Sequence, residues 1–445
     1  MIKKILIVIL MTLLLQGCTY REVDSTSIGE ESVEEVQVMS KRKAIANTDF
    51  LKTQGKNIYN DFGRGDLVQL KGVNIGGYLF QEFWMTPTKP SKNVKAELDI
   101  YRYLSDTYGK DRMRELIAVY QENYFTESDF NNLHDLGVNV VRLPFWYMNI
   151  IDESGEFLPD WFRRFDWFIS EAGKRGIYVI LDFHGAPGSQ NGSDHSGVDG
   201  EDHKEAASEF FFGPDEVVRS NQALYYKIWE EIAGRYRDNP VVAGYDLLNE
   251  PYCTYRYTSQ RTADELHELL WQVYDEAYTR IRAIDSDHII IMEATWNPID
   301  LPHPDKFAWT NVMYEYHNYL FDDYKNEEGK QIENMRKKVN LIEQANYDVP
   351  SFMGEFSYFD SYEAWNEGVK LLNDAGIHWT SWTYKVTSNY GNWGLYHHTG
   401  GDINIEAVDD DKLELIWAKV GDLRTNENLI DVLKKHFTYK DIAFE

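Results

Sequence analysis

The chain has 445 residues, enough for one large domain or two small ones, and its formal net charge is −28. This charge repels nucleic-acid phosphates and argues against nucleic acid as a partner. The 13 Trp and 30 Tyr residues offer flat apolar faces that suit neutral sugars, although core packing and an acidic, soluble surface would explain the same composition.

Residues 1–17 have the features of a secretory signal. Two lysines precede the apolar run Ile5–Leu15, which is too short to span a bilayer. The following residues, Leu15–Cys18 (LQGC), resemble the bacterial lipobox, in which the cysteine is lipidated and becomes the mature N-terminus. A plain signal peptide with an incidental cysteine is the alternative. The other cysteine is Cys253, so we expect no intrachain disulfide.

Residues 18–46 are polar and acidic and have no apolar period. This composition is typical of a disordered segment. With a lipid on Cys18, the segment would tether the folded domain to the membrane. We therefore expect a lipoprotein anchored at the bacterial cell surface that touches the membrane only through its lipid. Residues 47–445 contain no second domain boundary and are predicted to form a single domain.

Apolar, strand-like runs recur through residues 47–445, with helix-like segments between several of them. The predicted strands lie near Val68–Gly77, Asn139–Phe145, Tyr178–Gly185, Val242–Glu250, His288–Ala294, Val312–Tyr319, Pro350–Phe356 and His378–Lys385. Alternating strands and helices predict an α/β fold with a parallel sheet, and eight strands favour a closed (β/α)8 TIM barrel. A doubly wound open sheet is the alternative, but its glycine-rich phosphate-binding fingerprint does not follow the first strand.

Amphipathic periodicity and capping residues predict the helices. They are Phe162–Lys174, Tyr225–Tyr236, Ala263–Ala283, Asp411–Val420 and Asn426–Phe437, with a further start at Thr126–Asp129. Residues 295–311, between the fifth and sixth strands, have no clear helical pattern, and the sequence does not indicate what fills this position.

The fourth predicted strand ends in Asn249-Glu250-Pro251. The strand is mostly apolar, as expected when both faces are covered, and Pro251 cannot donate to a sheet, so the strand should stop at about Glu250. A carboxylate at the C-terminal end of such a strand lies where (β/α)8 barrels place their chemistry. A single turn glutamate is weak evidence, so other strand ends must supply partners.

Polar side chains do stand at the ends of other predicted strands. The candidate residues are Arg142, His184, Asn249, Glu250, His317, Tyr319, Glu355 and Trp382. Taken singly, each has an ordinary structural explanation, such as a core-edge ion pair, a buried histidine or packing. Together they would lie on one rim of one barrel, which favours a shared site.

Two carboxylates on one rim suit glycoside hydrolysis, which needs an acid for the leaving oxygen and a second carboxylate opposite it. Desolvation and a like-charged neighbour are expected to keep Glu250 protonated, whereas Arg142 and Tyr319 are expected to keep Glu355 ionised. We expect the oxygens of the two carboxyl groups to lie about 5 Å apart.

In this order along the chain, the eight candidates resemble the signature of glycoside hydrolase family 5, the cellulase family, over about Val68–Lys385. The resemblance implies a (β/α)8 barrel that retains anomeric configuration, with Glu250 as acid/base and Glu355 as nucleophile. It assigns the other six to substrate binding: Asn249 to the sugar 2-hydroxyl, Arg142 and Tyr319 to the nucleophile, His184 and His317 to the reacting-sugar subsite, and Trp382 to a platform beneath that sugar. It implies no cofactor and no metal.

Three motifs, LKGVNIGGYLFQEFWMTP, YFTESDF and LDFHGAPGSQNG, resemble the exo-β-1,3-glucanase branch of that family. Tyr78 stands where this branch usually has Trp, which bears on linkage specificity. Further candidate subsite residues are Glu82, Tyr255, Trp296 and Trp393. His195 and His203 lack the tight spacing of a metal site, and His397-His398 is expected to be a solvated loop pair.

The leading expectation is a retaining glycosidase that hydrolyses a β-glucan, either β-1,3-glucan or a cellulose-like chain. The alternatives are another β-glycanase such as a mannanase or β-1,6-glucanase, a transglycosylase, and a non-catalytic surface lipoprotein that binds glycans. The protein is expected to be a monomer whose partner is a β-linked polysaccharide or oligosaccharide.

Overall fold

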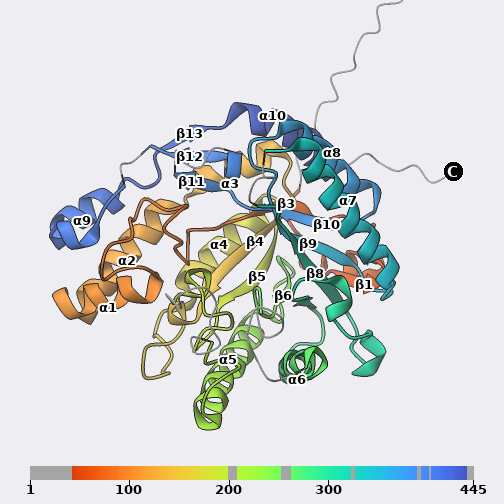
Figure 1. Ribbon diagram of the computed structural model, residues 1–445, viewed down its shortest axis with the longest axis horizontal. Coiled ribbons are helices and arrows are strands. Elements are labelled where there is room, and N and C mark those ends of the chain that lie inside the picture. The colour runs from red at the N-terminus through yellow and green to blue at the C-terminus, as the bar shows by residue number, and fades with distance from the viewer. Residues whose placement is uncertain are drawn as a thin grey trace, which may run out of the picture. The chain divides into compact units, whose positions relative to one another are not determined.

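The computed structural model describes residues 43–198, 208–251, 262–321, 326–387, 392–399 and 402–437. Eight parallel strands close into a barrel in the order β10-β3-β4-β5-β6-β7-β8-β9, and helices surround it (Figure 1). The strands are β3 (Lys71–Asn74), β4 (Val140–Trp146), β5 (Tyr178–Gly185), β6 (Val242–Asp246), β7 (Ile289–Glu293), β8 (Val312–Asn318), β9 (Ser351–Phe356) and β10 (His378–Ser381). The predicted (β/α)8 barrel is confirmed, and the open sheet is excluded.

The helices fill the connections unevenly. They are α1 (Glu97–Tyr108), α2 (Lys110–Tyr124), α3 (Glu127–Leu136), α4 (Phe162–Lys174), α5 (Asp215–Tyr236), α6 (Ala263–Arg282), α7 (Glu328–Ala345), α8 (Tyr362–Asp374), α9 (Asp410–Trp417) and α10 (Glu427–Phe437). The first three lie between β3 and β4. Residues 294–311, between β7 and β8, contain two 3-10 turns, Pro298–Asp300 and Pro304–Lys306, in place of a barrel helix.

Helix ends follow the chemistry of their residues. At the start of α3, the backbone N–H of Thr126 donates to Asp129 over 2.7 Å, which satisfies a donor that the helix itself leaves free. At its end, Gly137 has a φ of 87°, a left-handed conformation that costs glycine little. Helix α5 begins well before the predicted Tyr225, because its first ten residues, 215–224, bury no side chain and so have no apolar period.

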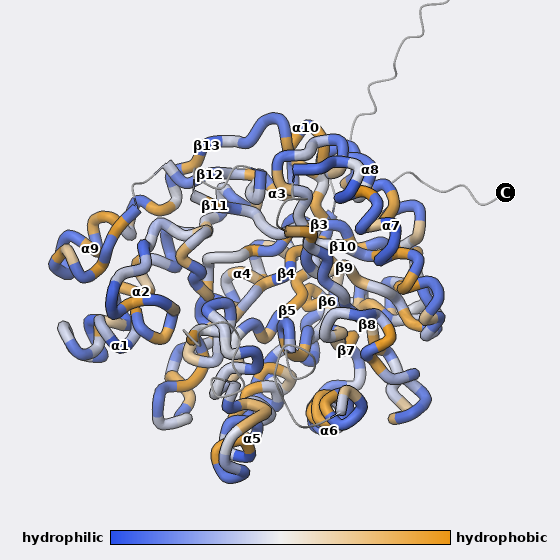
Figure 2. The backbone as a smooth tube through the Cα atoms, viewed as in Figure 1, coloured by the Kyte–Doolittle hydropathy of each residue, from blue (hydrophilic) through white to orange (hydrophobic). Residues whose placement is uncertain are grey.

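The interior of the barrel changes character along the strands. At its base, an apolar cluster includes Val140, Ile180, Ile291 and Met313, joined by Leu51 beside the β1–β2 hairpin (Lys52–Gln54 and Asn57–Tyr59). Two residues further along each of these four strands stand Arg142, Asp182, Glu293 and Glu315, which share the same face because strand side chains alternate. Figure 2 shows the apolar strand segments in orange. Charged groups therefore collect at the C-terminal end of a dry core.

Two predicted strands end four residues earlier than expected. Strand β6 stops at Asp246 rather than Glu250, and Glu250 has a φ of 40°, which strand residues do not adopt. The intervening backbone still bonds to its neighbours, since Leu247 N–H donates to Ile291 and Asn249 N–H donates to Phe183, both over 3.1 Å. The eighth strand, predicted as His378–Lys385, is likewise interrupted after Ser381, where β10 ends.

A second, three-stranded sheet follows the barrel. It consists of β11 (Lys385–Thr387), β12 (Tyr396–His398) and β13 (Leu423–Thr425). His397 and His398 lie in β12 and are buried, so the expectation of a solvated pair is wrong. His398 is covered by the ring of Tyr124, with centroids 4.9 Å apart. Within the residues that the structure describes, no helix has both the length and the apolar character needed to cross a bilayer.

Candidate active site

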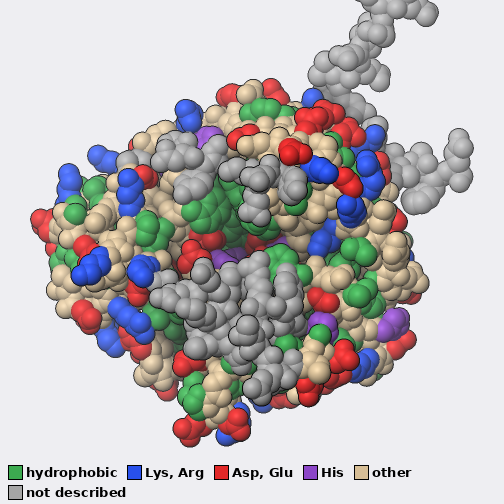
Figure 3. Space-filling model, in the orientation of Figure 1, with side chains coloured by type: hydrophobic (Ala, Val, Ile, Leu, Met, Phe, Trp, Pro, Cys, Tyr) green, Lys and Arg blue, Asp and Glu red, His purple; other side chains and the backbone are tan. Residues whose placement is uncertain are grey.

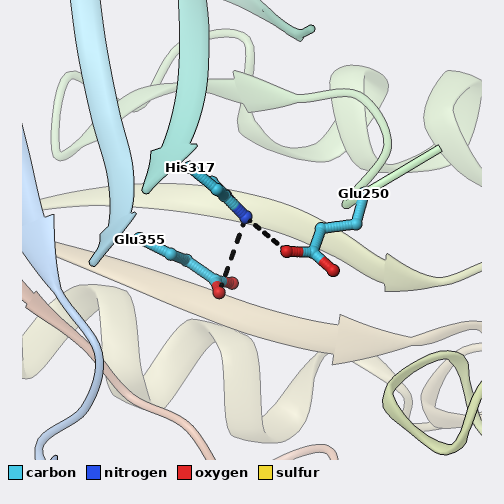
Figure 4. A group of neighbouring side chains, drawn as sticks. All are labelled: Glu250, His317 and Glu355. Carbon is cyan, nitrogen blue, oxygen red and sulfur yellow. Dashed lines mark hydrogen bonds and ion pairs between the residues drawn. The ribbon is translucent and has the colours of Figure 1, made fainter. Parts of the chain in front are cut away.

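Three side chains from separate strand ends meet at the C-terminal mouth of the barrel. Glu250 follows β6, His317 lies in β8 and Glu355 lies in β9. One carboxylate oxygen from each glutamate and one ring nitrogen of His317 all lie within 4.8 Å of one another. Figure 4 shows the His317 ring between the two carboxyl groups, with an interaction to each. The two carboxyl groups therefore approach as closely as expected.

The mouth of the barrel is recessed. In the view of Figure 3, a central hollow has acidic and histidine side chains on its floor, in red and purple, and hydrophobic side chains on its wall, in green. Glu250 and Glu355 are 8% and 5% exposed, so a molecule in the hollow could reach both of them. Because they are otherwise screened from water, electrostatic interactions at this site are strong.

Glu250 is held by two imidazole rings. Nδ1 of His317 lies 2.9 Å from its Oε1, and Nε2 of His195 lies 3.2 Å from its Oε2. Burial raises the pKa of the Glu250 carboxyl, but the contacts with His195 and His317 outweigh burial and lower the pKa well below its usual value. In the free protein the two imidazole contacts therefore oppose the desolvation that is expected to keep Glu250 protonated.

Glu355 is held by a cation and a hydroxyl. Nη1 of Arg142 lies 2.9 Å from its Oε1, and Tyr319 donates its hydroxyl proton to Oε2 over 2.9 Å. Burial nevertheless raises the pKa of Glu355 well above its usual value, against the lowering effect of Arg142. Arg142 and Tyr319 therefore favour the ionised form of Glu355, as expected, against the larger effect of burial.

The reason is that one guanidinium is shared among several carboxylates. Arg142 is fully buried and also contacts Asp182 at 3.0 Å, Asp246 at 2.7 Å and Glu315 at 3.2 Å. A single positive charge cannot balance all of them in a dry core. The group therefore retains protons: burial raises the pKa of Asp182 to about 7, and burial also raises the pKa values of Asp246 and Glu315.

Sequence reasoning missed these buried acids, together with Glu293, which accepts the backbone N–H of Glu250 over 2.6 Å. A signal for some of them was present. Asp182 lies two residues before His184, and Glu315 lies two residues before His317. Residues two apart in a strand face the same side, so both acids had to point into the barrel below a predicted site residue.

The remaining predicted residues, His184, Trp382 and Asn249, are also in contact with the site or with one another. The rings of His184 and Trp382 stack, with centroids 5.4 Å apart and planes 9° apart. Asp182 Oδ2 lies 2.7 Å from Nδ1 of His184 and fixes that ring. Nη2 of Arg142 donates to Oδ1 of Asn249 over 2.9 Å. All eight candidates from the sequence thus belong to one connected set of contacts.

The further subsite candidates separate into two groups. Glu82 is buried near the site, and Trp84 donates to it over 2.8 Å; burial raises its pKa to about 8. Trp393 packs on Tyr319, with centroids 5.7 Å apart. Trp296, by contrast, lines a different pocket between α6 and α7. Tyr255, His203 and Cys253 lie outside the described residues.

Glu250, His317 and Glu355 also present three atoms that could bind a metal ion. Two observations disfavour a cation there. The Arg142 guanidinium is already 2.9 Å from Glu355, so a second positive charge would be repelled. The Nδ1 atom of His317 that would bind the metal also lies 2.9 Å from Glu250. The residues fit a proton-transfer site better than a metal site.

A closed (β/α)8 barrel with paired carboxyl groups at its C-terminal mouth defines a class, the glycoside hydrolase barrels. Residues 106–388 match the family model of cellulase, glycosyl hydrolase family 5. The chain therefore belongs to this family.

Curated relatives agree with this assignment. A beta-xylosidase of Phanerodontia chrysosporium is 31% identical over 274 residues, covering 61% of this chain and 52% of the relative. A glucan 1,3-beta-glucosidase of Candida oleophila is 27% identical over 297 residues, covering 63% and 64%. The chain thus spans between half and two-thirds of the length of these relatives.

Solved structures share the fold. An endogalactoceramidase superposes with a TM-score of 0.58 at 18% identity, covering 86% of this chain and 84% of that one. The endoglucanase Cel5A of Thermotoga maritima superposes with a TM-score of 0.51 at 18% identity, covering 82% and 96%. At this level of identity the likeness concerns the barrel architecture.

Proposed function

We propose that the protein is a retaining glycosidase that hydrolyses a β-glucan by double displacement. The observation that carries the proposal is the approach of the Glu250 and Glu355 oxygens to within 4.8 Å. Retaining enzymes place their carboxyl groups about 5–5.5 Å apart, whereas inverting enzymes leave about 6.5–9.5 Å for a water molecule. Family membership and a relative named glucan 1,3-beta-glucosidase support the substrate class.

In the first step, a carboxylate oxygen of Glu355 attacks the anomeric carbon while Glu250 gives a proton to the leaving oxygen. The glycosidic bond breaks, a glycosyl ester forms on Glu355, and the leaving group departs as an alcohol. In the second step, water attacks the same carbon, Glu250 takes its proton, and Glu355 leaves as a carboxylate. Two displacements restore the original anomeric configuration.

The surrounding residues position the sugar and the nucleophile. Tyr319 and Arg142 each hold one oxygen of Glu355, which fixes the direction of attack. Asn249 uses its side-chain oxygen to accept from Arg142, so its amide nitrogen is the group left to donate to the sugar 2-hydroxyl. Trp382, held by the stacked His184 ring, offers a flat face for the sugar in the reacting subsite.

The test is a substrate screen in which the purified protein is incubated with laminarin, carboxymethylcellulose, lichenan, mannan and β-1,6-glucan, with product sizes resolved. We expect hydrolysis of a β-glucan, with the β-anomer as the first product by NMR. An initial α-anomer would contradict the retaining mechanism. Hydrolysis of mannan or β-1,6-glucan alone would show that this polysaccharide is the substrate instead. Longer products with an added acceptor sugar would identify a transglycosylase. Binding without turnover would identify a glycan-binding protein.

The proposal extends to cellular location and assembly. Cys18, outside the described residues, would carry a lipid, and residues 18–46 would tether a monomeric enzyme to the outer face of a bacterial membrane. The support is the LQGC motif directly after the apolar run Ile5–Leu15. Metabolic labelling with palmitate should label the protein and not C18A, and C18A should leave the membrane fraction. Light scattering of the purified domain should give the mass of one chain.

A further inference from the structure

His195 stands in a 3-10 turn, Asp194–Ser196, that follows β5 and brings its ring to the proposed acid/base. Its Nε2 lies 3.2 Å from Oε2 of Glu250, and its Nδ1 lies 3.7 Å from Oδ1 of Asp194. The other oxygen of Glu250, Oε1, is in contact with Nδ1 of His317. The His195 side chain is 19% exposed and that of His317 is 3% exposed, so His195 is the more solvent-accessible of the two rings.

This arrangement raises a question about the proton of the acid. Glycoside cleavage needs a protonated Glu250, but the two imidazole contacts lower the pKa of its carboxyl well below the usual value, against the raising effect of burial. An ionised Glu250 cannot protonate a leaving oxygen by itself. A neighbouring group must therefore hold the proton within reach.

His317 does not fit this role. Burial lowers the pKa of its ring to about 4, although Glu250 acts in the opposite direction, so the ring is neutral at pH 7. Its Nε2 lies 3.3 Å from Glu315, whose pKa burial raises well above the usual value. A protonated Glu315 can therefore donate to Nε2, and Nδ1–H of His317 then donates to Glu250 without giving up its proton.

His195 fits the role. Burial lowers the pKa of its ring, but hydrogen bonding and charge from Asp194 and Glu250 outweigh burial and raise the pKa well above 6.5. The other charged or titratable groups that face the His195–Glu250 pair are Glu82, His184, Asp182, Glu293, His317, Tyr319 and Glu355. Glu82 has a pKa of about 8 because of burial and is neutral at pH 7, so Asp194 and Glu250 are the charged partners on this side.

We propose that His195 is a positioning residue that stores the catalytic proton of Glu250, an inference that rests on the proposed glycosidase function. The reactive form has Glu355 as a carboxylate, which bonds to the anomeric carbon. The proton leaves Nε2 of the imidazolium and binds Oε2 of Glu250, and from there it moves to the leaving oxygen as the glycosidic bond breaks. His195 is then neutral, Glu250 is a carboxylate and Glu355 carries the sugar. In the second step the proton of the attacking water returns through Oε2 to Nε2, which restores the starting state.

The pH dependence of kcat/KM tests this proposal. In the wild type, the alkaline limb should report loss of the proton from the His195–Glu250 pair. In H195Q the proton can sit only on Glu250. Loss of the imidazolium raises the pKa of this carboxyl, but the alkaline limb then reports a carboxyl in place of an imidazolium whose pKa lies well above 6.5, so the limb should move to lower pH. At pH 7, kcat/KM for an aryl glucoside with a poor leaving group should fall more than about tenfold, whereas a dinitrophenyl glucoside should be nearly unaffected.

Other outcomes overturn the proposal. An unmoved alkaline limb would mean that His195 only packs against Glu250. A limb that moves to higher pH would mean that His195 acts as a fixed cation that lowers the pKa of Glu250. H303Q, which removes a histidine that is 53% exposed on the β7–β8 connection, is the matched control and should leave the profile unchanged. H195N replaces H195Q if the latter does not fold.

A second readout does not depend on turnover. The imidazole of His195, followed by NMR with labelled histidine, should titrate well above pH 6.5 in the wild type and at lower pH in E250Q, because the variant lacks the negative partner. Titration near pH 6.5 in both proteins would overturn the inference even in an active enzyme. Absence of glycoside turnover by the wild type, with the NMR result as expected, would instead contradict the proposed function.

Discussion

The hydroxyl of Tyr319 donates a hydrogen bond to Oε2 of Glu355 over 2.9 Å. Tyr319 follows β8, and Glu355 lies in the neighbouring strand β9, so the contact joins two adjacent strand ends. It stabilises the ionised form of the proposed nucleophile in a place where burial favours the neutral form. Attack by Glu355 depends on this ionised form, and therefore on Tyr319.

The variant Y319F should measure this dependence. Without the hydroxyl, the pKa of Glu355 rises further, so the acidic limb of the kcat/KM profile should move to higher pH. A hydrogen bond to a charged group contributes about 1.5–3 kcal/mol, so kcat/KM should fall roughly 10- to 100-fold. Y314F is the control. Tyr314 lies in β8 and donates its hydroxyl proton to the backbone oxygen of Pro302, and this variant removes that hydrogen bond. It should lower stability without moving the limb; an equal shift in both variants would contradict the interpretation.

The variant E355Q should lose turnover by more than about 10⁴-fold, because an amide oxygen is a poor nucleophile and no covalent intermediate can form. Folding should be preserved, since an amide of the same shape can accept from Arg142 through its oxygen and donate to the hydroxyl oxygen of Tyr319 through its nitrogen. Steady-state rates and urea unfolding curves measure the two effects. Activity near that of the wild type would remove Glu355 from the role of nucleophile.

The variant E250A should separate the substrates by leaving group. Loss of the acid should slow cleavage of glucans by roughly 10²–10⁴-fold. Dinitrophenyl glucosides need no protonation to leave, so the formation of the glycosyl–enzyme intermediate should stay fast and appear as a burst. Added azide should then speed turnover and yield a β-glycosyl azide. Equal slowing of both substrate classes would contradict the acid role.

Much of the barrel could be predicted because its strands are buried on both faces and read as apolar runs. Helix α4 was predicted with its observed bounds, Phe162–Lys174, since its buried face repeats with the helical period. The predictions of secondary structure fail where an element has no periodic pattern of apolar residues. The start of α5 lacks buried residues, and the segment after β6 keeps backbone bonds to its neighbours without strand geometry. His397 and His398 belong to strand β12, which no local pattern predicts.

Site residues near strand ends could be predicted from the sequence. The position of a loop residue and the pKa values of interacting carboxyl groups could not. Seven of the eight candidates stand near or just after the C-terminal ends of strands, which the barrel topology brings together, and Arg142 lies within β4 beneath them. The approach of His195 to Glu250 depends on the conformation of the turn Asp194–Ser196, which has no periodicity to read. The order of the pKa values depends on how many carboxylates share Arg142, and a sequence does not give that number.

Removal of metal ions should leave activity unchanged. In the proposed mechanism Arg142 supplies the positive charge at Glu355, and His195 and Glu250 supply the proton, so no Lewis acid is needed. After dialysis against EDTA, kcat/KM should stay within about twofold of its starting value, a change too small to reflect loss of a catalytic metal. A larger loss that returns on addition of Zn²⁺ or Ca²⁺ would mean that Glu250, His317 and Glu355 bind a cation after all.

The last prediction concerns stability and a carboxyl group outside the proposed chemistry. Glu97 is the first residue of α1 and is 2% exposed; its Oε2 accepts the backbone N–H of Gln81 over 3.1 Å. Burial raises its pKa to about 8, although the hydrogen bond from Gln81 lowers it. In the unfolded chain a glutamate has a pKa of about 4.3. Between these two values the folded protein binds more protons than the unfolded chain, so its stability falls as pH rises.

The variant E97Q removes this titration and keeps the shape and the acceptor oxygen. Its free energy of unfolding should equal that of the wild type near pH 4 and exceed it by roughly 2–5 kcal/mol at pH 8. Urea unfolding at several pH values measures the difference. E343Q makes the same change at an exposed position of α7 and reports the effect of the amide alone. If E97Q and the wild type differ by the same amount at pH 5 and pH 8, Glu97 does not carry a proton in the folded state, and the pH dependence must come from the carboxylates around Arg142.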